Sequence, residues 1–118
     1  MLLKMDLIML TLKATERLLC MLNMLERKHG IVNLDSHQRE FLEIIVRQNA
    51  AGQIITPNDL VDLNLTSRSS TYRKLADLRE LNLIKEDWID GQCQLSAADG
   101  TKEFINSLQN GIQFITAQ

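Results

Sequence analysis

Residues 2–28 constrain the fold more than any other segment, because their apolar side chains repeat with helical spacing along its whole length. The repeat forms two neighbouring stripes. They hold Leu3, Leu7, Leu10, Ala14, Leu18, Met21 and Leu25, and then Ile8, Leu12, Leu19 and Leu22. Together the stripes are wider than the single core-facing stripe of an ordinary helix. We therefore expect this helix to pack on its own domain and also on a second copy of the chain.

The chain is predicted to form one domain whose two ends hold a homodimer. Its 118 residues match the usual length of one compact domain, and they contain no repeat or internal linker. We assign residues 1–30 and 96–118 to the dimer and residues 36–95 to the core, and we expect Ser96 to cap the closing helix. The predicted dimerisation residues are Leu3, Leu7, Leu10, Leu18, Met21, Leu25, Ile112 and Ile115. The alternative is a monomer whose core buries residues 2–28.

The composition favours a mainly helical protein that is not an enzyme. One proline, five glycines and 4% aromatic residues argue against an all-β sandwich. Cys20 and Cys93 match neither a CxxC pair nor a zinc spacing, so we expect reduced, buried or partly buried thiols in a cytoplasm. No apolar run approaches the roughly 20 residues that cross a bilayer, and no secretory signal is expected. The absence of a phosphate loop, nucleophile motif or ligand cluster predicts no catalytic residue, cofactor or metal site.

Helix-start signals predict a helix-turn-helix in the middle of the chain. Thr56 can cap a brief helix that has Pro57 at its first position. A further cap, Thr66 or Ser67, then opens a second helix over residues 67–81. Two helices joined by a turn of about four residues form a helix-turn-helix, in which the second helix is the recognition helix.

A β-hairpin is predicted directly after the recognition helix. Asn82 can adopt the left-handed conformation that ends a helix. Asp90-Gly91 is a strong hairpin signal, around which residues 85–89 and 92–95 can pair as antiparallel strands. We expect Trp88 to pack this hairpin against the helices. The predicted fold is therefore mainly α with a small β-hairpin, a winged helix-turn-helix with long N-terminal and C-terminal dimerisation helices.

The charge distribution favours DNA binding by one segment, although the whole chain is acidic with a net charge of −2. Residues 66–85 carry five basic and two acidic side chains, a net charge of +3. Residues 86–118 carry one basic and five acidic side chains, a net charge of −4. A local basic face can steer DNA toward a protein whose overall charge is negative.

The recognition helix over residues 67–81 is expected to present one face to DNA. With about 100° between successive residues, Ser69 and Arg73 lie opposite its apolar side. An arginine in the major groove can donate two hydrogen bonds to guanine, which gives roughly 1–3 kcal/mol of discrimination. The predicted DNA-binding residues are Thr56, Ser67, Arg68, Ser69, Ser70, Tyr72, Arg73 and Lys74. The alternative is a solvated surface on which Arg73 and Lys74 pair with Asp77.

Four short segments follow the pattern of a known protein family. Residues 56–60 look like the start of a first motif helix, and residues 65–75 resemble a turn and recognition helix. Residues 78–84 are similar to a Leu-x-x-x-Gly-Leu-Ile passage into a wing, with Asn82 where glycine is usual. Leu95-Ser96 and Gly100 are similar to a Leu-Thr…Gly opening of the helix after a wing, with one extra residue between. Residues 36–108 thereby resemble the MarR family of bacterial transcription regulators. The resemblance implies a homodimer that binds double-stranded DNA and places each recognition helix in a major groove.

The tip of the predicted wing departs from the family pattern. It carries Glu86, Asp87 and Asp90, where the family usually places a basic residue for the minor groove. Phosphates repel an acidic tip, so we expect the wing to contribute little to DNA affinity.

Two other functions stay open at the level of the sequence. A winged helix can serve as a protein–protein interaction module without DNA binding, and the acidic wing suits that role. The other is an antagonist that dimerises with a larger regulator through Leu3 to Leu25. A small-molecule effector is possible, although no feature of the sequence indicates one.

Overall fold

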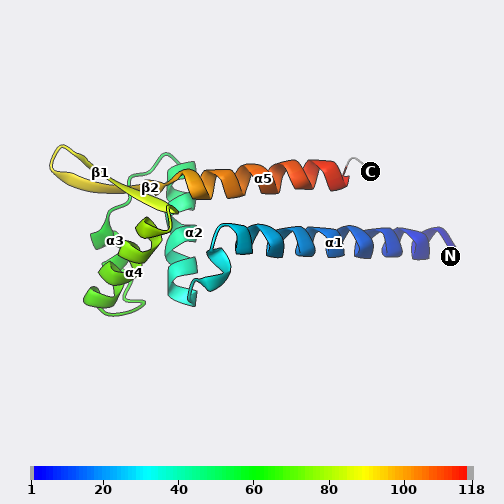
Figure 1. The fold of residues 1–118 in the computed structure, drawn as a ribbon, viewed down its shortest axis with the longest axis horizontal. Coiled ribbons are helices and arrows are strands. Elements are labelled where there is room, and N and C mark those ends of the chain that lie inside the picture. The colour runs from blue at the N-terminus through cyan, green and yellow to red at the C-terminus, as the bar shows by residue number, and fades with distance from the viewer. Residues whose placement is uncertain (1, 117–118) are drawn as a thin grey trace.

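The computed structural model describes residues 2–116, which form an elongated molecule with extents of 62 × 26 × 24 Å. The elements are α1 (Leu2–Lys28), the 3-10 helix η1 (Ile31–Asn33), α2 (Ser36–Ala50), α3 (Pro57–Asp62), α4 (Arg68–Glu80), β1 (Ile84–Ile89), β2 (Gln92–Ala97) and α5 (Asp99–Thr116). Figure 1 shows a lobe of α2, α3, α4 and the β-hairpin at one end, from which α1 and α5 project together. The fold is a winged helix, mainly helical with one two-stranded hairpin, as predicted.

The lobe closes around a core to which every one of its elements contributes. Helical spacing places one apolar stripe of α2 and one of α4 inward, and α3 and the hairpin cover the remaining sides. The most deeply buried side chains are Phe41, Ile45, Leu60, Leu75, Leu78, Leu83 and Ile84. This core fixes which side of α4 faces solvent.

Side-chain caps fix the starts of the three helices of the lobe. Asp35 and Gln38 form a reciprocal capping box at α2, and Thr56 and Asp59 form another at α3, where Pro57 is the first residue. At α4 the Ser67 side chain accepts a hydrogen bond from the Ser70 amide. The helix start predicted at Thr56 is therefore confirmed, and of the two caps predicted for the next helix, Thr66 and Ser67, it is Ser67 that caps α4.

The wing is an antiparallel hairpin whose register runs from Ile84 opposite Ala97 to Ile89 opposite Gln92. Asp90 and Gly91 turn the chain with φ angles of 52° and 76°, as the hairpin signal predicted. Asn82 ends α4 in the left-handed conformation, with a φ angle of 60°. Its side chain was expected to allow this conformation, and this prediction is confirmed.

The expectation that Ser96 caps the closing helix is wrong. The ladder continues beyond the predicted end at residue 95, so Ser96 lies in β2 opposite Lys85, and α5 begins at Asp99. The physical reason is a side chain of α2. Asn49 donates a hydrogen bond to the Leu95 carbonyl oxygen at 3.3 Å and accepts one from the Ala97 amide at 3.0 Å. These bonds hold the end of β2 extended.

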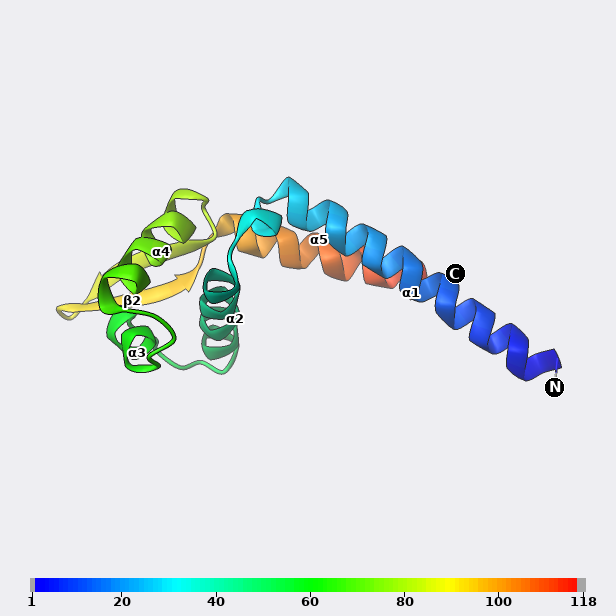
Figure 2. The same ribbon diagram turned by 90° about the horizontal axis from the view of Figure 1, so that it is seen from below.

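The helices α1 and α5 lie side by side and run in opposite directions (Figure 2). Near the lobe, the ring of His29 meets the edge of the Phe104 ring at a centroid distance of 6.0 Å. Further out, Gly111 provides the space for Met21, because a Cβ atom at Gly111 would lie 1.7 Å from the Met21 Sδ atom. Figure 2 shows that α1 then continues past the end of α5.

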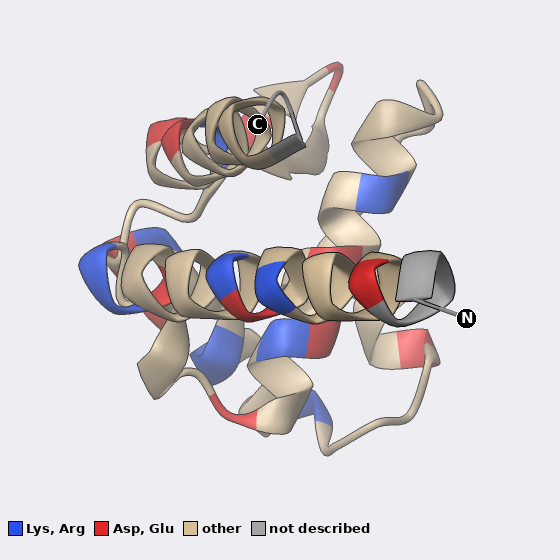
Figure 3. Ribbon diagram, turned by 90° about the vertical axis from the view of Figure 1, so that its right-hand side faces the viewer, with Lys and Arg blue, Asp and Glu red and all other residues tan. Residues whose placement is uncertain are grey.

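The projecting part of α1 exposes a wide apolar surface. Residues 7–12 contain no charged side chain, and Leu7 and Leu12 are 65% and 58% exposed. Figure 3 views this end of the molecule and shows the charged residues of α1 as separate bands with uncharged stretches between them. Leu18 and Leu25 share the helix face of Met21 and are half-buried, so part of the first stripe packs within the chain. The side chain of Leu3 lies outside the described side chains.

Two further predictions, the burial of Cys20 and the absence of a membrane-spanning helix, can be compared with the structure. Cys20 was expected to be buried or partly buried, but it is exposed, because it lies on a side of α1 that α5 does not cover. Within residues 2–116, no helix is both long enough and apolar enough to span a bilayer.

Candidate nucleic-acid interface

The outward face of α4 is set by the residues that the helix buries. Thr71, Leu75 and Leu78 lie in the core, so the opposite side of the helix, with Ser69 and Arg73, is exposed. The Arg73 guanidinium donates a hydrogen bond from Nη2 to the Ser70 Oγ atom at 3.0 Å, which holds the side chain along the helix surface. The predicted orientation of the recognition helix therefore agrees with its burial.

The start of α4 gathers groups that suit a phosphate. Ser67 caps the helix, and its Oγ atom lies 3.4 Å from the Ser69 Oγ atom. Arg68 is the first residue of this 13-residue helix, next to the backbone amides at its N-terminus. Helix N-termini attract anions because their N–H groups and the helix dipole both favour negative charge.

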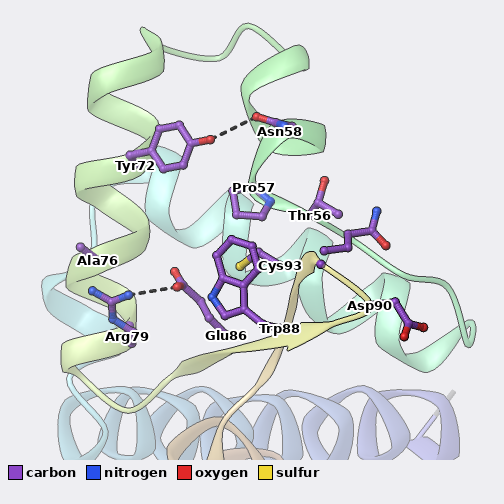
Figure 4. Close-up of a pocket in the computed structure, with 12 residues that line it drawn as sticks. Thr56, Pro57, Asn58, Tyr72, Ala76, Arg79, Glu86, Trp88, Asp90 and Cys93 are labelled. Carbon is purple, nitrogen blue, oxygen red and sulfur yellow. Dashed lines mark hydrogen bonds and ion pairs between the residues drawn. The ribbon is translucent and has the colours of Figure 1, made fainter.

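A cluster of three exposed side chains joins α3 to this end of α4. The Tyr72 hydroxyl donates a hydrogen bond to the Asn58 Oδ1 atom at 3.1 Å, and Arg68 Nη2 donates one to the same oxygen at 3.4 Å. The central carbon of the Arg68 guanidinium lies 5.6 Å from the centre of the Tyr72 ring. Figure 4 shows Tyr72 and Asn58 facing each other across the gap between α4 and α3.

Lys74, which the sequence assigned to DNA, lies on the flank of α4 that faces α2. Its ammonium forms an ion pair with Asp35, and this hydrogen bond lowers the pKa of the Asp35 carboxyl below its usual value. Asp77 accepts a hydrogen bond from Gln38 at 3.4 Å. The cation at Lys74 is thus partly neutralised by the protein.

A groove of about 690 Å³ separates α4 from the wing (Figure 4). The start of α3 with Thr56 closes one side, and Ala76 lies on the α4 wall. Arg79 and Glu86 bridge the helix and the wing through an ion pair of 3.0 Å. The sequence did not by itself identify Arg79 and Glu86 as partners. The sequence nevertheless held a signal for this pair. Arg79 follows Tyr72 and Ala76 at helical spacing, so the three share one side of α4, and the strand that carries Glu86 begins only a few residues later.

Trp88 was expected to pack the hairpin against the helices, but its side chain is 73% exposed over the groove. On β1 it shares a face with Ile84 and Glu86, and only Ile84 at the base of the strand reaches the core. The hairpin extends away from the lobe, so its outer residues have no helix to cover them. Cys93 is the partner of Trp88 across the ladder, and partial burial raises the pKa of its thiol. At neutral pH this cysteine is therefore a thiol rather than a thiolate.

Comparison with known proteins identifies the fold. No protein-family profile and no curated protein sequence matches the chain. Among solved structures, the chain is similar to the YusO protein of Bacillus subtilis, seen in an X-ray crystal structure, with a TM-score of 0.51 and 18% sequence identity. The similarity covers 96% of this chain and 78% of YusO. YusO is a MarR-family protein, so the chain has a MarR-like fold.

Proposed function

We propose that the chain is a sequence-specific, double-stranded DNA-binding protein and acts in the cytoplasm as a homodimeric transcriptional regulator. The observation that carries this proposal is the exposed N-terminal half of α4, where Arg73 lies opposite the buried stripe of Leu75 and Leu78 and Arg68 is exposed in the first turn. A MarR-like fold supports it, because it presents this helix at the end of the molecule opposite the projecting α1 and α5 (Figure 1).

In this proposal α4 enters the major groove and α3 lies on the backbone. Arg73 donates to a guanine, and Ala76 contacts a thymine methyl group. Arg68 and the amides at the start of α4 bind phosphates. The remaining contacts come from the hydroxyl groups of Thr56, Ser67, Ser69 and Ser70, whereas the Tyr72 hydroxyl donates its hydrogen bond to Asn58. Lys74 contributes less than a free lysine because Asp35 neutralises it.

The exposed end of α1 supports a second copy of the chain as partner. A short isolated helix is marginal in water, and most helices in proteins are stabilised by packing an apolar face. Ile8, Leu12 and Leu19 form an exposed α1 stripe, and Leu7 and Leu10 are also exposed, nearer the N-terminus of the helix. A symmetric partner covers this surface and places the two recognition helices about 34 Å apart, one turn of DNA.

A protein–protein interaction module without DNA binding is the second candidate function. The exposed indole of Trp88 favours it, because tryptophan is enriched at protein interfaces. The acidic wing tip, with Asp87 and Asp90 exposed, also favours a partner other than nucleic acid.

Replacing Arg73 tests the proposed reading face. Arg73→Ala is expected to weaken binding to a duplex selected by the unaltered chain by about tenfold, and to relax the preference at one base pair, because a bidentate contact is lost. Fluorescence anisotropy with the selected duplex and its single-base variants measures both effects. Lys102→Ala, which removes the same charge from α5, is the control and should leave both unchanged. Unchanged affinity and preference for Arg73→Ala would contradict this assignment.

Replacing Glu86 tests whether its ion pair with Arg79 keeps the Arg79 guanidinium from binding DNA. Glu86→Gln is expected to raise DNA affinity by about two- to fivefold at low salt, because it releases Arg79 from a partly exposed pair. Asp87→Asn removes the same charge from the opposite face of β1 and is the matched control. Equal gains for both variants in a titration at constant ionic strength would show that only the total charge of the wing matters.

A carboxylate in the exposed α1 stripe tests the dimer. Leu12→Glu is expected to convert a particle of twice the chain mass into a monomer, because a buried, unpaired charge opposes association. Sedimentation equilibrium measures the mass. Lys13→Glu places a carboxylate one position along, about 100° around the helix, and should leave the dimer intact. A monomeric unaltered chain, or a dimer that persists in Leu12→Glu, would exclude this interface.

A further inference from the structure

Asn58, Arg68 and Tyr72 form a hydrogen-bonded cluster in which Asn58 and Tyr72 contact Arg68 or its partner and need not contact DNA themselves. We propose, building on the proposed DNA binding, that Asn58 and Tyr72 are positioning residues for Arg68. They hold its guanidinium at the junction of α3 and α4, where it clamps a backbone phosphate of the DNA. Tyr72 thus acts through Arg68 rather than by reading a base.

The geometry of the cluster restrains the guanidinium from two directions. The Asn58 Oδ1 atom accepts a hydrogen bond from Arg68 Nη2 at 3.4 Å, and the ring of Tyr72 lies 5.6 Å below the guanidinium carbon. The Tyr72 hydroxyl donates to the same Asn58 oxygen at 3.1 Å, so it fixes the acceptor that Arg68 uses. Arg68 and Tyr72 are four residues apart on α4, which places them on the same side of the helix.

The cluster has little to contribute to the packing of the lobe. All three side chains are exposed, whereas Leu60 of α3 and Leu75 of α4 are buried in the shared core. A network of hydrogen bonds on the surface does, however, reduce the conformational freedom of a long side chain. Ordering such a side chain on binding costs free energy, and a residue that is already ordered avoids that loss.

The surroundings of Arg68 favour a phosphate as its ligand. A guanidinium has five N–H donors, of which the bond to Asn58 uses one, and its planar fork matches phosphate oxygens. Arg68 is the first residue of α4, beside the N-terminal amides that attract anions. Asn58 is the second residue of α3, so the clamp joins α3 to the first turn of α4.

A double-mutant cycle tests the proposal. The affinity of the full chain for a selected duplex is measured at several salt concentrations for Tyr72→Phe, Arg68→Ala and the double variant. Tyr72→Phe keeps the ring but loses the hydroxyl bond to Asn58, so it should weaken binding about three- to tenfold without changing the salt slope. Arg68→Ala should weaken binding and reduce the slope of log affinity against log salt by about 0.9, the loss of one phosphate contact.

The decisive result is the loss caused by Tyr72→Phe when Arg68 is already alanine. If Tyr72 acts only through Arg68, Tyr72→Phe should cause no further loss of DNA affinity in the Arg68→Ala variant. Asn58→Ala should likewise cause no further loss in that variant. Equal losses in both backgrounds, or an unchanged salt slope in Arg68→Ala, would overturn it while leaving DNA binding intact. An unaltered chain that binds no duplex would overturn the proposed function and this inference together. Melting temperatures verify folding, with Arg68→Gln as substitute if the alanine variant does not fold.

Discussion

Burial of one stripe of α4 is the interaction on which the rest of the structure depends. Leu75 and Leu78 are almost completely buried in a core that also holds Phe41 and Ile45 of α2. Because this stripe faces inward, the opposite side of α4 is presented to solvent with Ser69 and Arg73. The same core anchors the base of the wing through Ile84 and so sets the groove beside α4.

The charges around α4 are divided between paired and outward-facing groups. Lys74 is paired with Asp35 on the α2 flank, and Arg79 is paired with Glu86 across the groove. Arg68 and Arg73, by contrast, are exposed near the start of α4, and their hydrogen bonds go to the uncharged groups of Asn58 and Ser70. A small cationic site of this kind is what the proposed DNA binding requires of a chain whose net charge is −2. In the proposed dimer, two such sites would contact one duplex, and their combined affinity would exceed that of a single site.

Local signals in the sequence predicted most of the fold, whereas contacts between distant segments were not predictable. Thr56, Ser67 and Asn82 act on their own neighbours, so their residue types were sufficient to place helix ends. The position of Ser96 in β2 depends on Asn49, 47 residues earlier, and the exposure of Trp88 depends on how far the hairpin extends. The cluster of Asn58, Arg68 and Tyr72 likewise forms only because α3 packs against α4, so the sequence did not predict it.

The central claim, that α4 binds DNA, is tested most directly by the affinity of the chain for a random-sequence duplex at several salt concentrations, measured by fluorescence anisotropy. The account predicts micromolar binding whose logarithm falls linearly and steeply with the logarithm of the salt concentration, because cations at the start of α4 displace counterions from phosphates. Absence of binding even at low salt would contradict it, and the exposed surfaces of α1 and Trp88 would then mark contacts with other proteins.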